Sequence, residues 1–389
     1  MEVERTEESN PILVEIIRAE IERDGPMTFA RFMELALYHP AHGYYLSAER
    51  RPGRGGDFLT APEATPLFGL TLARQIAECW ERLERPEPFV VREYGAGVGG
   101  LAYDVIAGLS TEAPEVAAAL QYRLIEPNQH RLAQALAAMK EVGLAHVVMA
   151  EDGDDVEPII GVALANEVAD ALPVHRLVLR DGQFRERNIC WRNIGLAEVE
   201  GEPSPAAWTA IERLRAEGVV VPDGAAVDVS PAAAEWFAGV GRGLARGYAI
   251  IVDYGYPAQE LYRAHRLEGT VRAYFAHTVA DDALVRVGRQ DLTAHVDFTA
   301  LQRAGEAVGM RVAGFTTQGA FLASLGLGGR LVEMQRDPET TMPDYLAAQA
   351  AVLRLIDPGG LGRFGVLIMA KDAPVEPPLA GFAVTGPAF

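Results

Sequence analysis

The stretch that decides the fold of this chain reads Val90-Val91-Arg92-Glu93-Tyr94-Gly95-Ala96-Gly97-Val98-Gly99-Gly100. Its apolar beginning predicts a buried strand over residues 89–94, and the residues that follow it predict a helix over 101–109. The glycines at 95, 97 and 99 let the backbone approach a ligand closely, while N–H groups of the helix point at that ligand. Strand, glycine turn and helix in this order predict a ligand-binding turn.

The next predicted strand, 121–126, ends on the acidic residue Glu126. A carboxylate at this place accepts hydrogen bonds from the hydroxyls of a ribose. The G-x-G-x-G spacing fits a nucleoside better than the pyrophosphate of NAD, and Glu93 suits the ammonium of a methionine moiety because opposite charges pair. S-adenosylmethionine is therefore favoured over NAD. A tight turn without a ligand, with Glu126 as a helix-dipole partner, stays open.

Short apolar runs alternate with helical patterns from residue 89 onward, which is typical of a parallel sheet with crossover helices. The sequence predicts an α/β fold with a seven-stranded Rossmann-like sheet, preceded by a helical segment and covered by large insertions. The predicted strands are 89–94, 121–126, 146–149, 161–166, 247–253, 311–316 and 364–370.

The predicted domain organisation has a helical N-terminal segment with a glycine-rich loop, a sheet domain and a C-terminal tail. Long insertions at one end of a sheet usually cover the substrate site rather than form a separate domain. The tail is rich in Pro, Gly and Ala and is expected to fray. These parts are 1–60, 61–373 with insertions at about 171–246, 255–296 and 317–360, and 374–389.

Two local patterns predict individual elements, a pair of helices and a hairpin. The apolar spacing of residues 11–37 predicts two helices that are interrupted at Gly25-Pro26. Two strand-like pieces in the first insertion, 174–180 and 184–192, flank Asp181-Gly182, which is a hairpin-type turn.

Composition and charge indicate which classes of partner and site to expect. A formal net charge of −19 argues against nucleic acid as a partner and makes a basic peptide or protein electrostatically easier to bind. The sequence shows no signal-peptide pattern and no run of about eighteen apolar residues, so a cytoplasmic protein without a membrane segment is expected. Cys79 and Cys190 are isolated, so no metal site is expected either. A homodimer stays open.

Polar side chains follow the fourth predicted strand, at the edge where open α/β sheets bind ligands. Asn166 is a candidate for orienting the substrate, and Glu167 and Asp170 are candidates for accepting hydrogen bonds from a cationic nucleophile and deprotonating it. The alternatives are a helix N-cap for Asp170 and a solvated loop charge for Glu167.

Further acidic residues lie downstream. Asp253 ends the fifth strand and either supports the site or caps a loop, and Asp297 is interpreted as the N-cap of a helix over 298–308. Asp291 and His295 are candidates for an acid–base pair or a metal pair, and the absence of other ligands disfavours the metal pair.

Taken together, these motifs resemble the MidA-type S-adenosylmethionine-dependent methyltransferases, which include the mitochondrial assembly factor for respiratory complex I. The resemblance spans nearly the whole chain. It rests on the segments 56–63, 93–99, 166–173, 253–255, 269–277, 290–298 and 317–322.

The resemblance implies a class I methyltransferase sheet, S-adenosylmethionine as donor and, for the mitochondrial relative, methylation of arginine on a protein. It implies a set of cofactor-binding residues and a set of catalytic residues. These are Gly56, Asp57, Thr60, Glu93, Gly95, Gly97, Gly99, Glu126 and Asn166 for the cofactor, and Asn166, Glu167 and Asp291 for catalysis.

The chain departs from the family pattern at two places. Tyr94-Gly95-Ala96-Gly97-Val98 replaces a Leu-Gly-Pro-Gly-basic type of loop but keeps the glycines, and Val168-Ala169 replaces bulky aromatic residues beside the expected methyl acceptor. The second departure motivates one alternative, a small-molecule N- or O-methyltransferase of specialised metabolism. An assembly factor without turnover also stays open, although the intact Glu93, Gly95, Gly97 and Glu126 argue against it.

Overall fold

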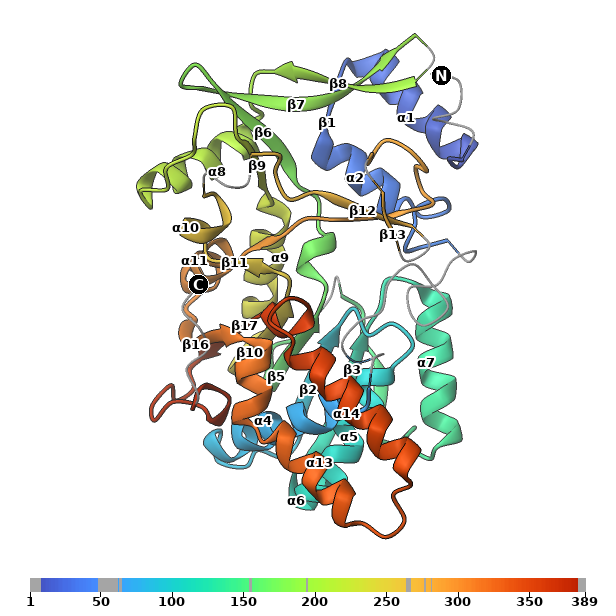
Figure 1. The fold of residues 1–389 in the computed structure, drawn as a ribbon, viewed down its shortest axis with the longest axis vertical. Coiled ribbons are helices and arrows are strands. Elements are labelled where there is room, and N and C mark those ends of the chain that lie inside the picture. Colours follow the sequence, from blue (N-terminus) through green and yellow to red (C-terminus); the bar gives the residue numbers. More distant parts are fainter. Residues whose placement is uncertain are drawn as a thin grey trace. The chain divides into compact units, whose positions relative to one another are not determined.

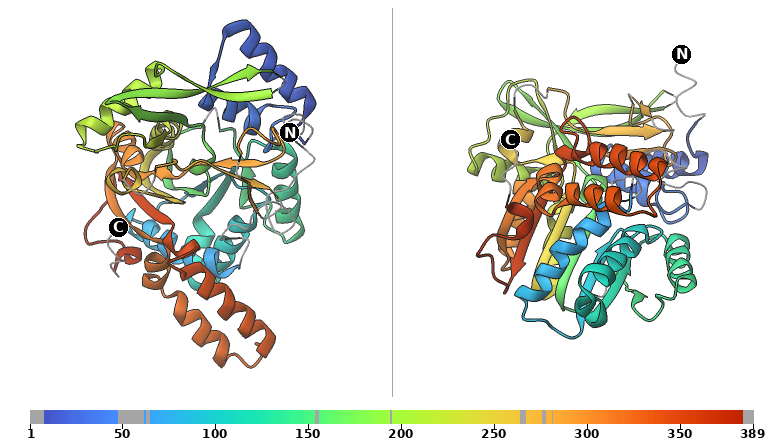
Figure 2. Two further views of the ribbon diagram at one scale, coloured as in Figure 1. Left: turned by 45° about the horizontal axis from the view of Figure 1, so that its top comes forward. Right: turned by 60° about the horizontal axis from the view of Figure 1, so that its bottom comes forward.

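The computed structural model describes residues 8–47, 62, 65–153, 156–193, 195–263, 267–275, 278–280 and 282–383. The chain divides into two compact units. We call Thr60–Val168, Phe237–Tyr254 and Gln302–Phe389 the sheet unit, and Met1–Leu59, Ala169–Trp236 and Gly255–Leu301 the insertion unit. Figures 1 and 2 show the elements of both.

A seven-stranded sheet built from described residues organises the sheet unit, in the order β16-β17-β10-β5-β2-β3-β4. The pairs from β10 to β4 are parallel, whereas β17 is antiparallel to both of its neighbours. This arrangement is a class I methyltransferase sheet and confirms the predicted fold. Its strands are β2 (Phe89–Tyr94), β3 (Leu120–Ile125), β4 (Val148–Ala150), β5 (Ile159–Asn166), β10 (Leu244–Asp253), β16 (Arg311–Thr317) and β17 (Gly365–Lys371).

Helices cover both faces of this sheet. On one face the apolar side chains of β2, β3 and β5 pack with those of α4 and α5 in one hydrophobic cluster. On the other face Met369 of β17 lies against Gly305 of α11, which also approaches Phe237 of α9. The helices of the sheet unit are α4 (Leu67–Arg82), α5 (Gly100–Glu112), α6 (Pro114–Ala119), α7 (Gln129–Glu141), α12 (Gln318–Ser324), α13 (Leu327–Arg336), α14 (Met342–Ile356), η2 (Leu361–Arg363) and η3 (Ala380–Phe382). The helices α9 (Pro231–Arg242) and α11 (Phe298–Ala307) span the division between the units.

The expectation that the C-terminal tail frays is wrong for its described part. Leu379 is fully buried, and the backbone N–H of Gly381 donates to Gln75 Oε1 at 3.0 Å. Arg82 donates to the carbonyl oxygens of Pro377 and Pro378. Side chains of α4 therefore satisfy backbone groups that a Pro-rich segment cannot pair with itself. Residues 384–389 lie outside the described part of the chain.

The insertion unit contains a second sheet, in the order β1-β7-β6-β9 with β8 beside β7. Its hairpin confirms the predicted one, since Arg180 pairs with Gln183 across Asp181-Gly182, both of which have positive φ. Its strands are β1 (Met27–Thr28), β6 (His175–Arg180), β7 (Gln183–Arg192), β8 (Gly195–Gly201), β9 (Ala226–Val229), β11 (Gly255–Tyr256), β12 (Arg272–Phe275), β13 (Thr278–Ala280), β14 (Asp291–Thr293) and β15 (Val296–Asp297). Its helices are α1 (Pro11–Asp24), α2 (Phe29–Tyr38), η1 (Ala169–Ala171), α8 (Pro205–Ala216) and α10 (Ala258–Leu261).

The N-terminal helices belong to this unit because their connection joins its sheet. Met27 pairs with Ile189, and both side chains lie in a hydrophobic cluster of the unit. The insertions expected at 171–246 and 255–296 fall largely in the same unit, whereas the segment 317–360 falls in the sheet unit, where α13 and α14 pack side by side (Figure 2). No helix of the described ranges is long and apolar enough to cross a membrane.

A buried ion pair ties three strands of the main sheet together. Arg92 of β2 is fully buried and lies opposite Arg123 in the register of the neighbouring strand β3. Both guanidinium groups donate to Glu151, which follows β4, at 2.5 and 2.8 Å from Arg92 and 2.9 Å from Arg123. Because Arg92 is buried beside a second positive charge, the carboxylate of Glu151 is the counter-charge that makes the burial of Arg92 tolerable.

We expect Glu151→Gln to lower the free energy of unfolding by about 3–5 kcal/mol, since it leaves Arg92 buried without a counter-charge. Urea unfolding measures this change. Glu141→Gln, an exposed site at the end of α7, is the control and should change the stability by less than about 0.5 kcal/mol. The double variant Arg92→Met/Glu151→Gln should recover part of the loss; if Glu151→Gln behaves like the control, the ion pair does not stabilise the sheet.

Candidate active site

The carboxyl ends of β2 and β5 form the point at which the sheet reverses its strand order. The chain runs from β2 to β3 on one side, and β5 is followed by β10 on the other. Ligands of open α/β sheets bind in the crevice outside such a point. The predicted glycine turn follows β2, and the predicted polar residues follow β5, so the sheet unit brings both groups to the same edge.

The glycine turn adopts a backbone shape that needs glycine. Gly95, Gly97 and Gly99 have φ values of 69°, 56° and 83°, in the left-handed region. A Cβ atom on Gly95 would meet the side chain of Val168 at 2.7 Å, whereas a Cβ atom on Gly97 would have no described heavy atom within 4 Å. Gly97 is therefore the position where the turn presents bare backbone to open space.

Glu126 holds this turn in place. One carboxylate oxygen accepts the backbone N–H of Gly97 at 2.8 Å, and the other accepts the N–H of Asn128 at 2.9 Å. The alternative of a helix-dipole partner receives partial support, because Asn128 is the N-cap of α7. Each carboxylate oxygen keeps a second lone pair, so Glu126 can also accept hydrogen bonds from a ribose.

Glu93 lies within the sheet, close to the glycine turn. Its side chain is buried and accepts a hydrogen bond from the hydroxyl of Tyr122 at 2.7 Å. Burial raises the pKa of Glu93 to about 8, against the opposing hydrogen bond from Tyr122, and the nearby charge of Glu126 raises this pKa further. A carboxyl group in this state is mostly neutral near pH 7, and an ammonium brought beside it would favour its ionised form.

Asn166 and Glu167 lie at the end of β5, as the sequence predicted. The Nδ2 group of Asn166 donates to Glu167 Oε1 at 3.0 Å, and none of the described residues donates a hydrogen bond to the buried Oδ1 of Asn166. Glu167 has φ 54°, which is unusual for a residue other than glycine. Its N–H donates to the carbonyl of Val252 at 2.9 Å. Such backbone strain is typical of functional sites.

Asp253 supports the site, which was one of its two interpretations. This fully buried residue ends β10, and its carboxylate accepts the N–H of Val168 at 3.1 Å and that of Tyr254 at 2.7 Å. Asp253 therefore joins the segment after β5 to the segment after β10. The sequence did not reveal this link, because 85 residues separate Val168 from Asp253.

The remaining predicted catalytic residue, Asp291, belongs to the insertion unit. It lies buried on β14, and its Oδ1 accepts a hydrogen bond from the hydroxyl of Tyr45 at 2.7 Å. The ring of Tyr45 stacks on that of Tyr38 with 5.5 Å between centroids. That Asn166 and Glu167 converge with Asp291 stays a prediction.

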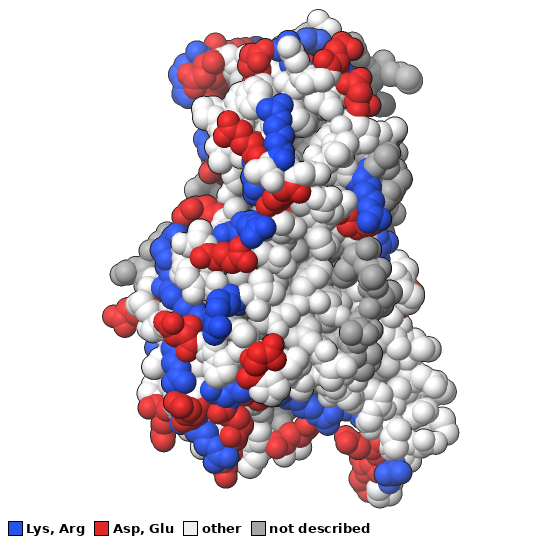
Figure 3. All heavy atoms as spheres, turned by 90° about the vertical axis from the view of Figure 1, so that its left-hand side faces the viewer, with Lys and Arg blue, Asp and Glu red and all other residues white. Residues whose placement is uncertain are grey.

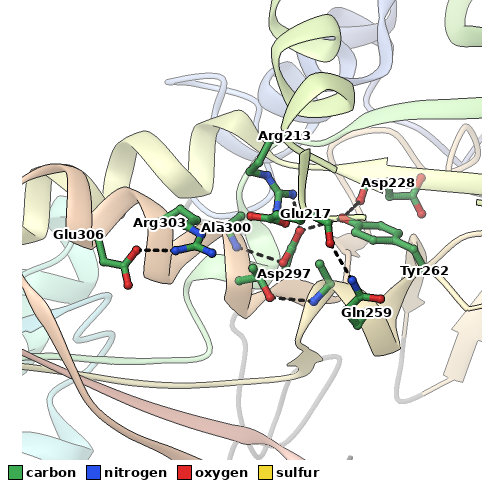
Figure 4. Close-up of polar contacts among 11 residues, drawn as sticks. Arg213, Glu217, Asp228, Gln259, Tyr262, Asp297, Ala300, Arg303 and Glu306 are labelled. Atoms are coloured by element: carbon green, nitrogen blue, oxygen red, sulfur yellow. Dashed lines mark hydrogen bonds and ion pairs between the residues drawn. The ribbon is translucent and has the colours of Figure 1, made fainter. Parts of the chain in front are cut away.

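Asp297 is confirmed as a helix cap. Its Oδ1 accepts the N–H of Ala300 at 3.0 Å in the first turn of α11, and its Oδ2 pairs with Arg213 of α8 at 2.5 Å (Figure 4). Tyr262 donates to the same Oδ2 at 3.3 Å. Asp297 thus links α8, α10 and α11 and has a structural role within the insertion unit.

Gly56, Asp57 and Thr60 lie outside the described residues, so their predicted part in cofactor binding stays a prediction. No group of three or more His, Cys, Asp and Glu side chains suited to a metal ion occurs in the part of the chain that the structure describes.

Residues 71–316 match the protein family described as "Putative S-adenosyl-L-methionine-dependent methyltransferase". The chain belongs to this family. A crystal structure of a protein from Burkholderia thailandensis bound to S-adenosyl-homocysteine is 32% identical, covers 96% of this chain and 94% of that one, and superposes with a TM-score of 0.85.

Two curated relatives are mitochondrial proteins. The "Protein arginine methyltransferase NDUFAF7 homolog" of Drosophila melanogaster is 28% identical over 402 residues, covering 94% of this chain and 86% of the relative. "Protein arginine methyltransferase NDUFAF7" of Mus musculus is 28% identical over 354 residues, covering 83% and 77%. The resemblance that the motifs carried is confirmed.

This methyltransferase therefore uses S-adenosylmethionine as its methyl donor. The described residues fit that cofactor in two respects. Gly97 leaves room where a Cβ atom would otherwise project, and Asn166 offers a buried Oδ1 to which no described group donates. A buried acceptor of this kind is costly unless a ligand or water satisfies it.

We expect Gly97→Val to abolish binding of S-adenosylhomocysteine, because the valine side chain projects into the space left by Gly97. Isothermal titration calorimetry measures the affinity. Gly143→Val is the matched control, since Gly143 also has positive φ, at 81°, and also has no described heavy atom within 4 Å of an added Cβ. The control carries the same backbone strain but should bind normally; unchanged affinity of Gly97→Val would remove this turn from the cofactor site.

A second expectation concerns pH. Because folding raises the pKa of Glu93 from 4.5 to about 8, the folded state binds more protons than the unfolded state between these values. The wild-type protein therefore becomes less stable as the pH rises through this window. Glu93→Gln has no carboxyl group to titrate and lacks this loss. The free energy of unfolding of the variant relative to that of the wild type should therefore rise on the order of 1 kcal/mol per pH unit. Urea unfolding from pH 5 to 9 measures it, and parallel profiles would contradict it.

Proposed function

We propose that this methyltransferase transfers the methyl group of S-adenosylmethionine to an arginine side chain of a protein. The observation that carries the proposal is Glu167, a carboxylate fixed at the end of β5 beside Asn166. The names of the relatives from Drosophila and mouse support the same acceptor.

An arginine acceptor needs carboxylates. The guanidinium group is protonated in water and has a delocalised charge, so its nitrogen is a poor nucleophile. A carboxylate that accepts two N–H groups localises a lone pair on the reacting nitrogen and receives the proton that leaves it. The cofactor supplies the electrophilic methyl group on its sulfonium.

Glu167 meets the structural requirement for this role. Its backbone N–H is fixed to Val252, and the Nδ2 group of Asn166 holds its Oε1. The neighbouring Val168 N–H is fixed to Asp253. The strained residue is therefore held from both sides, and a rigid carboxylate loses less freedom when it orients a substrate.

Asp291 is the second proposed carboxylate. The hydroxyl of Tyr45 donates to one of its oxygens, which orients the carboxyl group within the insertion unit. We infer that the carboxylate of Asp291 accepts N–H groups of the guanidinium. The net charge of −19 also favours a basic acceptor.

A small-molecule acceptor is the second candidate, and Val168 favours it. The side chain of Val168 lies directly against Gly95 of the cofactor turn. An aromatic residue, which the family pattern led us to expect there, would fill more of the space beside this turn. The smaller side chain leaves volume for an acceptor of different shape.

We expect Glu167→Gln to keep its affinity for S-adenosylhomocysteine and to lose methyl transfer by at least a hundredfold, because the amide preserves shape but cannot accept the proton. The assay incubates enzyme and methyl-labelled cofactor with cell extract and asks whether label enters arginine of protein. Glu141→Gln on the exposed end of α7 is the control and should transfer at the wild-type rate.

Wild-type turnover of Glu167→Gln would remove Glu167 from the mechanism. Label that enters small molecules and no protein would reject the arginine proposal in favour of the second candidate. Asp291→Asn separates the two carboxylates: if it raises the KM for the acceptor while Glu167→Gln lowers kcat, the first binds the acceptor and the second takes the proton.

A further inference from the structure

The insertion unit contains an arginine-lined cleft that the mechanism does not use. Its volume is about 510 Å³, within the range of ligand pockets. Four of its lining residues are Arg176, Arg180, Arg187 and Arg272, and its lining also includes the acidic Glu268. The chain has 54 acidic and 35 basic residues, so a mainly basic lining contrasts with the acidic character of the whole protein.

The hairpin strands β6 and β7 supply three of these arginines. Leu177 of β6 pairs with Glu186 of β7, so Arg176 and Arg187 lie opposite each other on the antiparallel pair. Directly opposed like charges are destabilising. Two carboxylates compensate Arg176, Glu198 of β8 at 2.7 Å and the buried Asp228 of β9 at 3.3 Å, whereas Arg187 lies 3.9 Å from Glu198.

The fourth arginine comes from a segment that is fixed rigidly. The buried carboxylate of Asp228 accepts the backbone N–H groups of Thr270 and Val271 and the hydroxyl of Thr270. Gly269 has φ 78°, and a Cβ atom there would lie 2.5 Å from Asp228 Oδ2, so this close approach requires glycine. Arg272 follows directly and is thereby held at the cleft.

The charges of Arg272 and Arg180 are poorly compensated. Arg272 donates to the carbonyl of its neighbour Val271 at 2.7 Å, and no salt bridge joins it to a carboxylate of the described residues. Arg180 pairs with Glu200 at 3.0 Å, but 49% and 40% of these side chains are exposed, so the pair contributes little. On the face drawn in Figure 3, acidic and basic side chains lie next to one another.

The shape and lining of the cleft decide the class of ligand. Arg176 and Arg180 are four residues apart on one strand, so their Cα atoms lie roughly 13 Å apart and the basic lining extends along the strand. Among the described residues, the lining includes aliphatic side chains and no aromatic ring on which a nucleotide base would stack. Several carboxylates spaced along an extended chain match this arrangement, because arginine binds carboxylates in a bidentate manner.

We propose that this cleft binds an acidic, extended segment of the protein methyl acceptor. The inference rests on the proposed function, in which the acceptor is a protein. It assigns acceptor recognition to two places: carboxylates that bind the target arginine, and arginines that bind acidic residues elsewhere on the same acceptor.

Fluorescence anisotropy with a labelled (Glu-Gly)5 peptide tests the proposal, since alternate residues of an extended chain place their carboxylates on one face. We expect saturable binding that weakens with salt, no binding of (Gln-Gly)5, and at least a tenfold higher Kd for Arg180→Gln/Arg272→Gln. The control is Arg336→Gln/Arg354→Gln, which removes the same charge from exposed positions of α13 and α14 and should bind as the wild type does.

The outcomes separate this proposal from the proposed function. Absence of peptide binding by a protein that binds S-adenosylhomocysteine normally, equal weakening in both double variants, or displacement of the peptide by inorganic phosphate at an equal concentration of charge would overturn it. Excess (Glu-Gly)5 should also inhibit labelling of protein in the extract. If the peptide binds but no protein is labelled in any sample, the arginine proposal fails and the cleft is not an acceptor site.

Discussion

The carboxylate of Glu126 is the interaction on which the candidate active site depends. The glycine turn after β2 carries only the side chains of Ala96 and Val98, neither of which can form a hydrogen bond, and its three glycines adopt left-handed φ values. Glu126 fixes the middle of the turn by accepting the N–H of Gly97, and it fixes the start of α7 by accepting that of Asn128. This side chain, which directly follows β3, acts together with the N–H groups of Gly95 and Ala96, which donate to the carbonyl of Ile125, to give the turn a defined shape. Open space remains over Gly97.

Buried carboxylates that accept backbone N–H groups recur through the chain. Asp253 joins the segments after β5 and β10, and Asp228 fixes Thr270 and Val271 of the insertion unit. In each case a charged acceptor forms strong hydrogen bonds with N–H groups that no ladder satisfies. These loops are therefore ordered by side chains rather than by regular secondary structure, which lets them carry functional groups in fixed positions.

The strands of the main sheet could be predicted because a buried parallel strand is a continuous apolar run. The hairpin at Asp181-Gly182 and the cap at Asp297 could be predicted because their residue types have local conformational preferences. The expectation that the tail frays was wrong for residues Pro374 to Phe382, because side chains of α4, about three hundred residues earlier, bind its backbone. Short strands such as β1, β9 and β14 carry too few residues to show a period.

The sequence by itself determined the fold class, the cofactor turn and the acidic residues at the strand ends, because each is a local pattern of polarity and glycine. Only the tertiary structure decided what these acids do. Glu93 is buried against Tyr122, Glu126 and Asp253 hold backbone, and Arg272 lines a cleft with arginines from a hairpin about a hundred residues earlier. The burial of a side chain, its pKa and its hydrogen-bond partners depend on which segments distant in the sequence come into contact. The local order of residues does not specify which strands pair with each other.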